Sequence, residues 1–141
     1  MKHVKEHPTA LTCFKAYDVR GELGVNFDAT IACTIGQAVA QHFHAKNIVI
    51  GFDARETSPE LTAAVMHGIC EAGCNVLLLN LAGTEEMYWA VTEFNACAGI
   101  EITASHNPIN YNSLKIVKSS SQPLNDQKDF EAIKLLAENG T

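Results

Sequence analysis

The sequence predicts an α/β fold of three layers (α/β/α), with helices on both faces of a mostly parallel, mixed sheet of four strands. Stretches rich in β-branched residues alternate with stretches of helical periodicity along the whole chain. The strand-like stretches are almost entirely apolar, which is typical of strands buried on both faces. The length of 141 residues, 47% of them hydrophobic, suits one domain with a substantial core.

The elements follow one another in a regular order. Residues 1–10 are expected to form a flexible tail, and residues 11–141 a single α/β domain. A short, partly apolar strand over 12–17 precedes the four strands that are expected to build the sheet. The sheet strands are expected over 46–51, 74–80, 96–103 and 114–117, with helices over 28–43, from 58, from 84 and over 126–138.

Two of these helices carry capping signals at their starts. Ser58 can cap the helix that follows it, Pro59 fits the first helical position, and Glu60 suits the positive end of the helix dipole. Thr84 is expected to cap the next helix, and two glutamates follow it in the first turn. These signals place both helix starts directly after predicted strands.

Composition excludes several classes of function. The balance of 10 Lys and Arg against 16 Asp and Glu leaves a net charge of −6, which argues against a nucleic-acid partner. No apolar run approaches the roughly 20 residues of a membrane-spanning helix, and the first residues lack the apolar core of a signal peptide. The 5 cysteines match no zinc or disulfide framework. We therefore expect a cytoplasmic protein whose cysteines are mostly buried and reduced.

The stretch 99–108 carries the clearest chemical signal. A buried strand is expected to end at Thr103, and Ser105, His106 and Asn107-Pro108 follow it at once. Ligands of open α/β sheets bind beyond the carboxyl ends of strands, and the residue before a proline is kept out of helical conformation. The serine hydroxyl is thus expected on a constrained, exposed loop.

A serine hydroxyl needs an activating neighbour to act as a nucleophile. His106 and Lys115 are the nearby candidates, and both can also neutralise phosphate oxygens, which phosphoryl transfer requires. The same residue types are equally typical of a well-capped turn with no chemistry. The residues of this loop alone leave both interpretations open.

Four motifs in order resemble one family. They are TASHNP at 103–108, followed by Tyr111, Asn112 and Lys115; FKAYDVRG at 14–21; GFDARETSPEL at 51–61; and GTEEMY at 83–88. From about residue 12 onward the chain resembles the first domain of the α-D-phosphohexomutases, closest to the bacterial phosphomannomutases and phosphoglucomutases. The loop at 103–108 is the most specific of these matches.

The resemblance implies a mechanism and roles for individual residues. Ser105 would carry a phosphoryl group, pass it to a hexose 1- or 6-phosphate and recover the other phosphate from the bisphosphorylated sugar. Arg20 and Lys115 would stabilise charge or move protons, and His106 would assist beside the serine. Glucose or mannose 1,6-bisphosphate would serve as activator.

The resemblance also implies contacts to sugar and metal. Tyr17 would line the sugar site, and Asn107 would shape the loop. Mg²⁺ would be held by the phosphate on Ser105 and by three aspartates of a second domain, and no such aspartate motif is present in this sequence. The natural sugar stays undetermined, because the family distinguishes mannose from glucose outside this domain.

Most of these residues also have an ordinary structural interpretation. Arg20 can be a surface ion-pair residue, Lys115 a solvated strand lysine and Tyr17 a core or edge-strand aromatic. Asp53 and Arg55 are expected to pair or to cap the following helix rather than to do chemistry.

The sequence departs from the family pattern at several points. Ser113 stands where the family usually has glycine, which would cost about 1 kcal/mol if the backbone there required a positive φ. Phe52 stands where an arginine is usual. Because the family's later domains are absent, we expect exposed apolar surface and a possible homodimer.

Two other functions compete with a mutase. A non-catalytic binding module that retains the fold is the alternative, and it has no need of a phosphate on Ser105. A serine hydrolase is disfavoured, because the sequence has no Gly-x-Ser-x-Gly elbow and no acid placed to orient His106.

Overall fold

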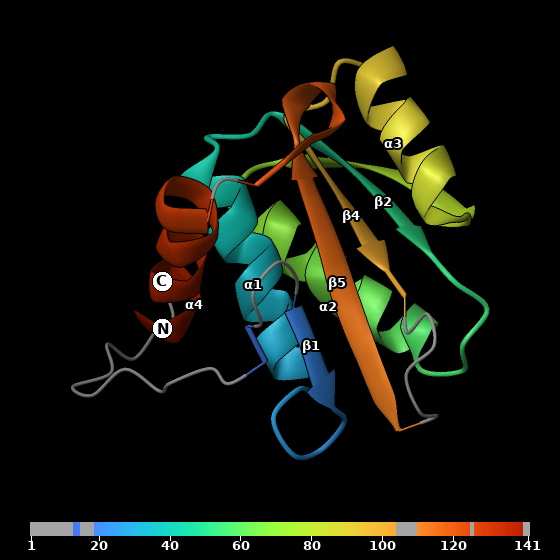
Figure 1. Ribbon diagram of the computed structural model, residues 1–141, viewed down its shortest axis with the longest axis vertical. Coiled ribbons are helices and arrows are strands. Elements are labelled where there is room, and N and C mark those ends of the chain that lie inside the picture. Colours follow the sequence, from blue (N-terminus) through green and yellow to red (C-terminus); the bar gives the residue numbers. More distant parts are fainter. Residues whose placement is uncertain (1–12, 15–18, 104–109, 125, 140–141) are drawn as a thin grey trace.

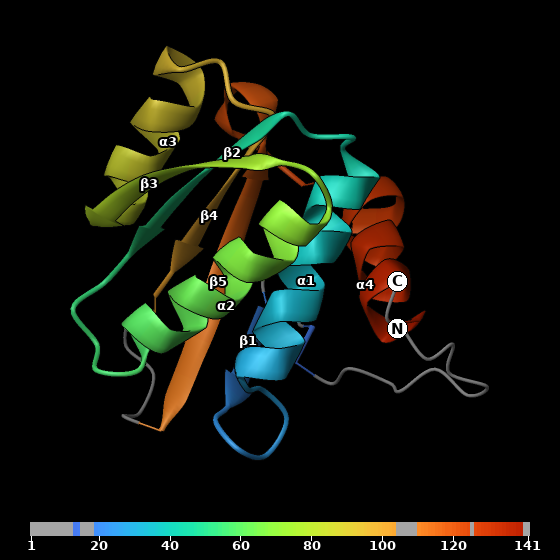
Figure 2. The ribbon, with the colours of Figure 1, turned by 180° about the vertical axis from the view of Figure 1, so that it is seen from behind.

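The computed structural model of the chain describes residues 13–14, 19–103, 110–124 and 126–139. These residues form an α/β fold in which helices cover both faces of a central sheet (Figures 1 and 2). The predicted fold class is therefore confirmed. The strands are β1 (Val19–Glu22), β2 (Asn47–Phe52), β3 (Asn75–Leu81), β4 (Ala98–Ile102), β5 (Tyr111–Lys118) and β6 (Gln122–Pro123).

The sheet is mixed, with strand order β1-β5-β4-β2-β3, and the short β6 pairs with β5. β3, β2 and β4 are parallel to one another, whereas β5 runs antiparallel to both β4 and β1. The described residues thus form six strands rather than the predicted four. The additional two, β1 and β6, are short and half polar, so they lack the apolar run that marks the other strands.

The first predicted strand begins later than expected. Phe14 forms only an isolated bridge with Val19, and the paired strand β1 starts at Val19 itself. The remainder of the predicted strand 12–17 lies outside the described residues. β1 is placed by its pairing with β5, a long-range contact that apolar spacing does not report, and Gly21 within it packs closely against the side chains of Asn26 and Phe27.

The four predicted helices are all present. They are α1 (Ala29–His42), α2 (Ser58–Glu71), α3 (Thr84–Glu93) and α4 (Glu131–Asn139), which continues from the π-helical turn η2 (Asp126–Phe130); a short 3-10 turn, η1 (Ser119–Ser121), follows β5. In Figures 1 and 2, α1, α2 and α4 lie on one face of the sheet and α3 lies on the other. The sheet is therefore covered by three helices on one side and by one on the other.

The helix caps differ from the prediction by one residue. α2 is capped by Thr57 without a side-chain bond, and Ser58 is a buried residue of the first turn whose hydroxyl is used elsewhere. α3 is capped by Gly83, whose N–H donates to Glu86 Oε1 at 3.1 Å, so Thr84 is already helical. Both predictions placed the cap one residue too late, because the chain turns into each helix one residue earlier.

Two hydrophobic clusters fill the space on either side of the sheet. Alternate residues of the central strands, such as Ile48 and Ile100, face α1, α2 and α4, whereas Val49 faces α3. α1 and α2 approach each other closely because Gly68 has no side chain: a Cβ there would collide with the carbonyl of Cys33. Each fully buried aliphatic side chain contributes about 1.5–3 kcal/mol to stability.

The cysteines and the helix lengths bear on the composition-based expectations. None of the five cysteines forms a disulfide within the described residues, but only Cys13 and Cys74 are buried, and Cys70 is exposed. The expectation that most are buried was wrong for the remaining three. Burial raises the pKa of the Cys74 thiol to about 11, so this thiol stays protonated.

Among the described residues no helix has the length and apolarity to cross a membrane.

Candidate functional site

α3 covers only part of its side of the sheet and leaves a polar region beyond it. Beneath α3 lie Val49 of β2 and Val117 of β5. Two positions further along the same face, the register places Gly51 beside Glu101 and Glu101 opposite Lys115. The carboxyl ends of β2 and β4 therefore present polar residues on the face that α3 leaves uncovered.

Two predicted site residues meet in this region. Arg20 of β1 is opposite Ser113 of β5, and Lys115 is two residues further along β5. This makes Arg20 and Lys115 diagonal neighbours, roughly 7–8 Å apart on one face. Neither forms an ion pair with any other described residue, so the interpretation of Arg20 as a surface ion-pair residue finds no support in the described part of the chain.

The other predicted site residues lie outside the described residues. They are Ser105, His106, Asn107 and Tyr17. Their predicted roles stay predictions. What the structure describes is the frame on either side of 104–109, and that frame fixes where the segment begins and ends.

One cross-strand pair holds the residue that precedes 104–109. The N–H of Thr103 donates to the Ser113 carbonyl at 3.0 Å, and the Ser113 hydroxyl donates to the Thr103 carbonyl. Ser113 lies in β5 and does not have a positive φ. The strain expected from serine in place of glycine is therefore absent, and its hydroxyl adds a bond that glycine would lack.

Asp53 joins the end of β4 to the start of α2. Its Oδ1 accepts hydrogen bonds from the Arg55 N–H at 3.1 Å and the Ser58 hydroxyl at 2.5 Å. Its Oδ2 accepts from the Thr103 hydroxyl at 3.1 Å. Asp53 is thus bonded to the first turn of α2, although Thr57 rather than Asp53 is the cap, and the bond to Thr103 adds a link to the strand that precedes Ser105.

Asn112 completes this support from the other strand. Its Nδ2 donates to Thr57 Oγ1 at 2.9 Å and to Ser58 Oγ at 3.1 Å, and its Oδ1 accepts from the Ser113 N–H at 2.8 Å. The side chain is fully buried. Sequence reasoning used Asn112 only as part of a motif and assigned it no role. The available signal was an asparagine beside a predicted buried strand, because a buried amide needs hydrogen-bond partners.

Glu101 is the functional candidate that sequence reasoning missed. The residue is 1% exposed, and neither carboxylate oxygen has a hydrogen-bond partner among the described residues. A Cβ on Gly51 would lie 2.6 Å from Glu101 Oε1, so a larger residue at position 51 would require the carboxyl group to shift. A charged residue inside an otherwise apolar strand was the available signal.

The surroundings of Glu101 disfavour its charge. Burial raises its pKa from 4.5 to about 8, Asp53 and Glu86 push the pKa in the same direction, and Lys115 lowers it. Glu101 therefore holds a proton at neutral pH. A buried carboxyl of this kind marks a functional-site candidate when it lies beside charged neighbours.

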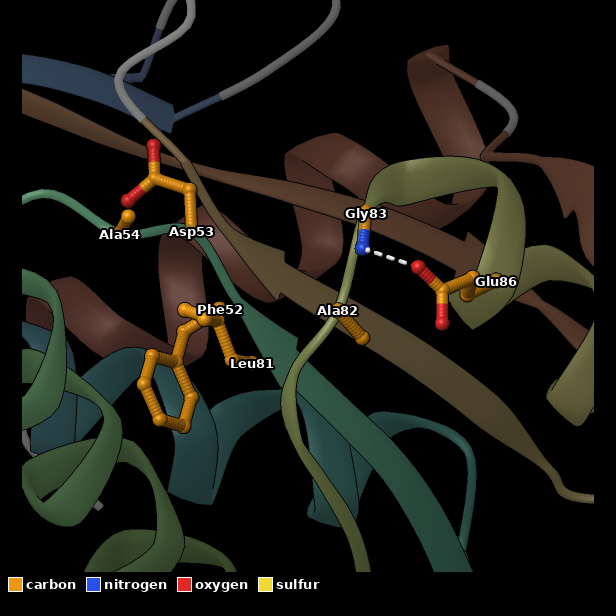
Figure 3. A pocket seen from close by; sticks show the side chains of 7 residues that line it. All are labelled: Phe52, Asp53, Ala54, Leu81, Ala82, Gly83 and Glu86. Atoms are coloured by element: carbon orange, nitrogen blue, oxygen red, sulfur yellow. Dashed lines mark hydrogen bonds between the residues drawn. The ribbon is translucent and has the colours of Figure 1, made fainter.

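A shallow pocket of about 290 Å³ opens nearby, between the ends of β2 and β3 and the start of α3. Figure 3 shows Asp53 and Glu86 on opposite sides of this pocket, with Glu86 bonded to the Gly83 N–H. Phe52 packs against the core on the far side of the sheet, so the position where the family usually has an arginine carries no positive charge. The lining residues are Phe52, Asp53, Ala54, Leu81, Ala82, Gly83 and Glu86.

The described residues do not assemble a binding site for Mg²⁺. No group of three or more His, Cys, Asp or Glu side chains among them could hold a metal ion. Both oxygens of Asp53 are already engaged by hydrogen-bond donors. A metal site that includes this chain would have to draw its ligands from elsewhere.

Comparison with known proteins identifies what this arrangement is similar to. Residues 11–141 match the model of the phosphoglucomutase/phosphomannomutase alpha/beta/alpha domain I. A phosphomannomutase of Klebsiella pneumoniae is 45% identical over 92% of this chain and 83% of its own length. An Escherichia coli phosphomannomutase is also 45% identical over 92% of this chain, but that match spans only 28% of the relative.

Solved structures give the same result. A phosphoglucomutase/phosphomannomutase family protein from Burkholderia thailandensis matches 89% of this chain and 29% of its own, with a TM-score of 0.79 and 29% identity. A structure from Thermus thermophilus matches 92% of this chain and 30% of its own, with a TM-score of 0.82 at 24% identity, which supports the fold alone. The chain thus spans less than a third of most of these relatives.

Proposed function

The chain belongs to the phosphoglucomutase/phosphomannomutase family as its domain I, and from this premise we propose that it supplies the phosphoserine domain of a cytoplasmic hexose-phosphate mutase. Phosphomannomutases are phosphohexomutases, which are isomerases of carbohydrate metabolism. In the proposed reaction a hexose phosphate is the substrate, and the phosphate moves between O1 and O6 of the sugar.

The proposed chemistry passes through Ser105. Its Oγ–phosphorus bond breaks as a sugar hydroxyl oxygen bonds to phosphorus and loses its proton, which gives a bisphosphorylated sugar. The intermediate turns around, the Ser105 Oγ attacks the other phosphorus, and a proton returns to the released sugar oxygen. His106 assists beside the serine, Tyr17 lines the sugar site, and Asn107 shapes the loop.

One observation carries this proposal: Arg20 and Lys115 lie on one face, beside the anchored ends of 104–109. Two cations on one face balance the charge that spreads over a transferred phosphoryl group. Thr103, Asp53 and Asn112 hold the frame around the loop through hydrogen bonds, and the two cations are supplied by other residues. This division between support and charge suits a reaction that depends on positioning.

The metal requirement is proposed for a longer protein that includes this domain. Bound Mg²⁺ would neutralise negative charge on the phosphoryl group. Ser105 would contribute through its phosphate, and the remaining ligands would come from a second domain. Glucose or mannose 1,6-bisphosphate is proposed as the activator that phosphorylates Ser105.

Self-association is a further proposal about the chain by itself. Leu81 is 63% exposed and Trp89 is 61% exposed, and Phe94 packs edge-on against Trp89 with ring centroids 6.0 Å apart. Exposed apolar side chains of this size favour contact between copies. Sedimentation at increasing concentration tests this, and Trp89→Ser should shift the chain toward the monomer.

Intact-protein mass before and after incubation with glucose 1,6-bisphosphate and Mg²⁺ tests the proposed function. One added phosphate is expected, and Ser105→Ala should abolish it. Lys115→Met should slow the phosphorylation by about 100-fold or more, which is typical for loss of a group that stabilises transition-state charge. Absence of the phosphate, also when the remaining domains are added in trans, would favour the non-catalytic binding module.

A further inference from the structure

We propose that Glu101 is a positioning residue for Lys115: the lysine either pairs with an ionised Glu101 or reaches out to an anion while Glu101 holds a proton. The anion in this inference rests on the proposed function, whereas the link between the two side chains does not. The proton that Glu101 takes up comes from solvent. The geometry of β4 and β5 is what points to this pair.

The first step of the argument is the placement of the two residues. Glu101 and Lys115 are directly opposite in the antiparallel pair of β4 and β5, which puts their Cβ atoms about 4.5–5.5 Å apart on one face. Both side chains are long enough to meet. They do not form an ion pair in the structure, and Lys115 remains half-buried while Glu101 is enclosed.

The second step is the cost of leaving Glu101 unpaired. A buried carboxyl without a hydrogen bond is unfavourable whether it is ionised or neutral, and more so when ionised. The carboxyl group occupies the space beside Gly51, where a side chain at position 51 would otherwise lie. The arrangement lacks only a donor, and Lys115 is the cation across from it.

The third step is the balance of charge around the pair. From the turn after β2 Glu101 faces Asp53, from α3 it faces Glu86, and from β5 it faces Lys115. Two acids oppose ionisation and one cation favours it. If an anion draws Lys115 away, ionised Glu101 loses its one favourable neighbour, and uptake of a proton becomes the stable outcome.

The consequence for the proposed site is a link between anion and proton. A neutral Glu101 leaves the charges of Arg20 and Lys115 available to a phosphate. An ionised Glu101 competes with the phosphate for Lys115. Anion affinity should therefore fall as pH rises through about 8, where Glu101 ionises.

Carbon-13 NMR of the Glu101 carboxyl in this chain tests the pair without any ligand. The Glu101 midpoint should lie well above 4.5, and Lys115→Met should raise it further by about one pH unit, because the neighbouring cation is lost. A merely structural Glu101 would titrate at the same pH with and without the positive charge at position 115.

Matched variants keep this test decisive. Lys118→Met removes a cation from the same strand that pairs with Asp129 instead, so it should leave the Glu101 midpoint unchanged. Lys115→Arg keeps the charge and should preserve the midpoint if Lys115→Met proves unfolded. A Glu101 midpoint near 4.5, or one that ignores the loss of charge at position 115, overturns the inference.

Addition of glucose 6-phosphate at pH 8 then separates this inference from the proposed function. A rise of the Glu101 midpoint on addition supports both. A coupled pair that does not respond to the anion upholds the pairing of Glu101 and Lys115 and counts against a hexose-phosphate site on this face.

Discussion

Two buried carboxyl groups, those of Asp129 and Glu101, lie on opposite sides of the sheet and differ in their hydrogen bonding. Asp129, 8% exposed, accepts hydrogen bonds from His42 Nε2 at 3.0 Å and Lys118 Nζ at 3.0 Å. Glu101, 1% exposed, has no hydrogen-bond partner at either oxygen within the part of the chain that the structure describes. The Asp129 carboxylate is therefore paired with two cationic side chains. Glu101 forms no such pair with Lys115, the cation opposite it on β5.

This difference in hydrogen bonding shows which of the two carboxyl groups stabilises the fold. Asp129 ties α1, β5 and η2 together, and a fully bonded charge cluster of this kind fixes one arrangement of the elements. Glu101 instead weakens the fold at the edge where chemistry is proposed. Residues that lower stability in this way are often found at functional sites.

The largest change in stability should come from removing the Asp129 carboxylate. Asp129→Ala leaves Lys118 and His42 without their acceptor and should lower the free energy of unfolding by about 3 kcal/mol. Urea denaturation measures this loss. Glu131→Ala, at an exposed position in the neighbouring turn, is the control and should change stability by less than about 0.5 kcal/mol. Equal effects of the two variants would contradict the role given to Asp129.

A smaller loss is expected at the frame of the loop. Asn112→Ala removes three hydrogen bonds and leaves Ser58 and Thr57 without this donor, which should cost about 2 kcal/mol. Hydrogen exchange at the Ser113 amide should accelerate, because its acceptor is lost. An unchanged exchange rate at Ser113 would show that Asn112 does not hold this end of the loop.

Removal of the Glu101 charge should raise stability, in contrast to the loss expected for Asp129→Ala. The pKa of Glu101 is raised on folding, so wild-type stability should fall as pH increases from about 4.5 to about 8. Glu101→Gln stays neutral and should flatten that part of the profile, so that the variant is more stable than the wild type at pH 8. Thermal unfolding at several pH values measures both. A parallel decline in the variant would assign the pH dependence to other groups.

The smallest effect should come from Mg²⁺. Because the described residues assemble no metal-binding group, 5 mM Mg²⁺ should leave the melting temperature of the unphosphorylated chain unchanged within about 1 °C. Calorimetry with and without EDTA checks this. A clear stabilisation would reveal a metal site within these 141 residues and would alter the contrast between the two carboxylates.

Sequence reasoning was most successful where the signal is local. The apolar runs of β2, β3 and β4 and the periodicity of the helices predicted those elements, because burial requires apolar residues at those spacings. β1 was misplaced and β6 was missed because they are short and depend on pairing with β5. The caps at Thr57 and Gly83 shifted by one residue for a similar reason, since backbone turns rather than side chains define them.

The site was predicted in part. Arg20 and Lys115 could be selected from motifs, but their position on one face follows from the antiparallel insertion of β5 between β1 and β4. Glu101 was missed because its face depends on that same register. Asp129 and His42 are 87 residues apart, and no local pattern reports a bond across that separation. The roles of Ser105, His106, Asn107 and Tyr17 stay predictions.

The cross-strand tie between Thr103 and Ser113 has a consequence for how this fold can change over time. It closes the segment between them into a ring whose two ends are fixed by the sheet itself. The entropy of closing such a ring rises slowly with its length, by about 0.6 kcal/mol for each doubling. Lengthening the chain between the two residues would therefore cost little in closure entropy, whereas loss of the Ser113 hydroxyl would remove one of the two bonds that tie Thr103 to β5.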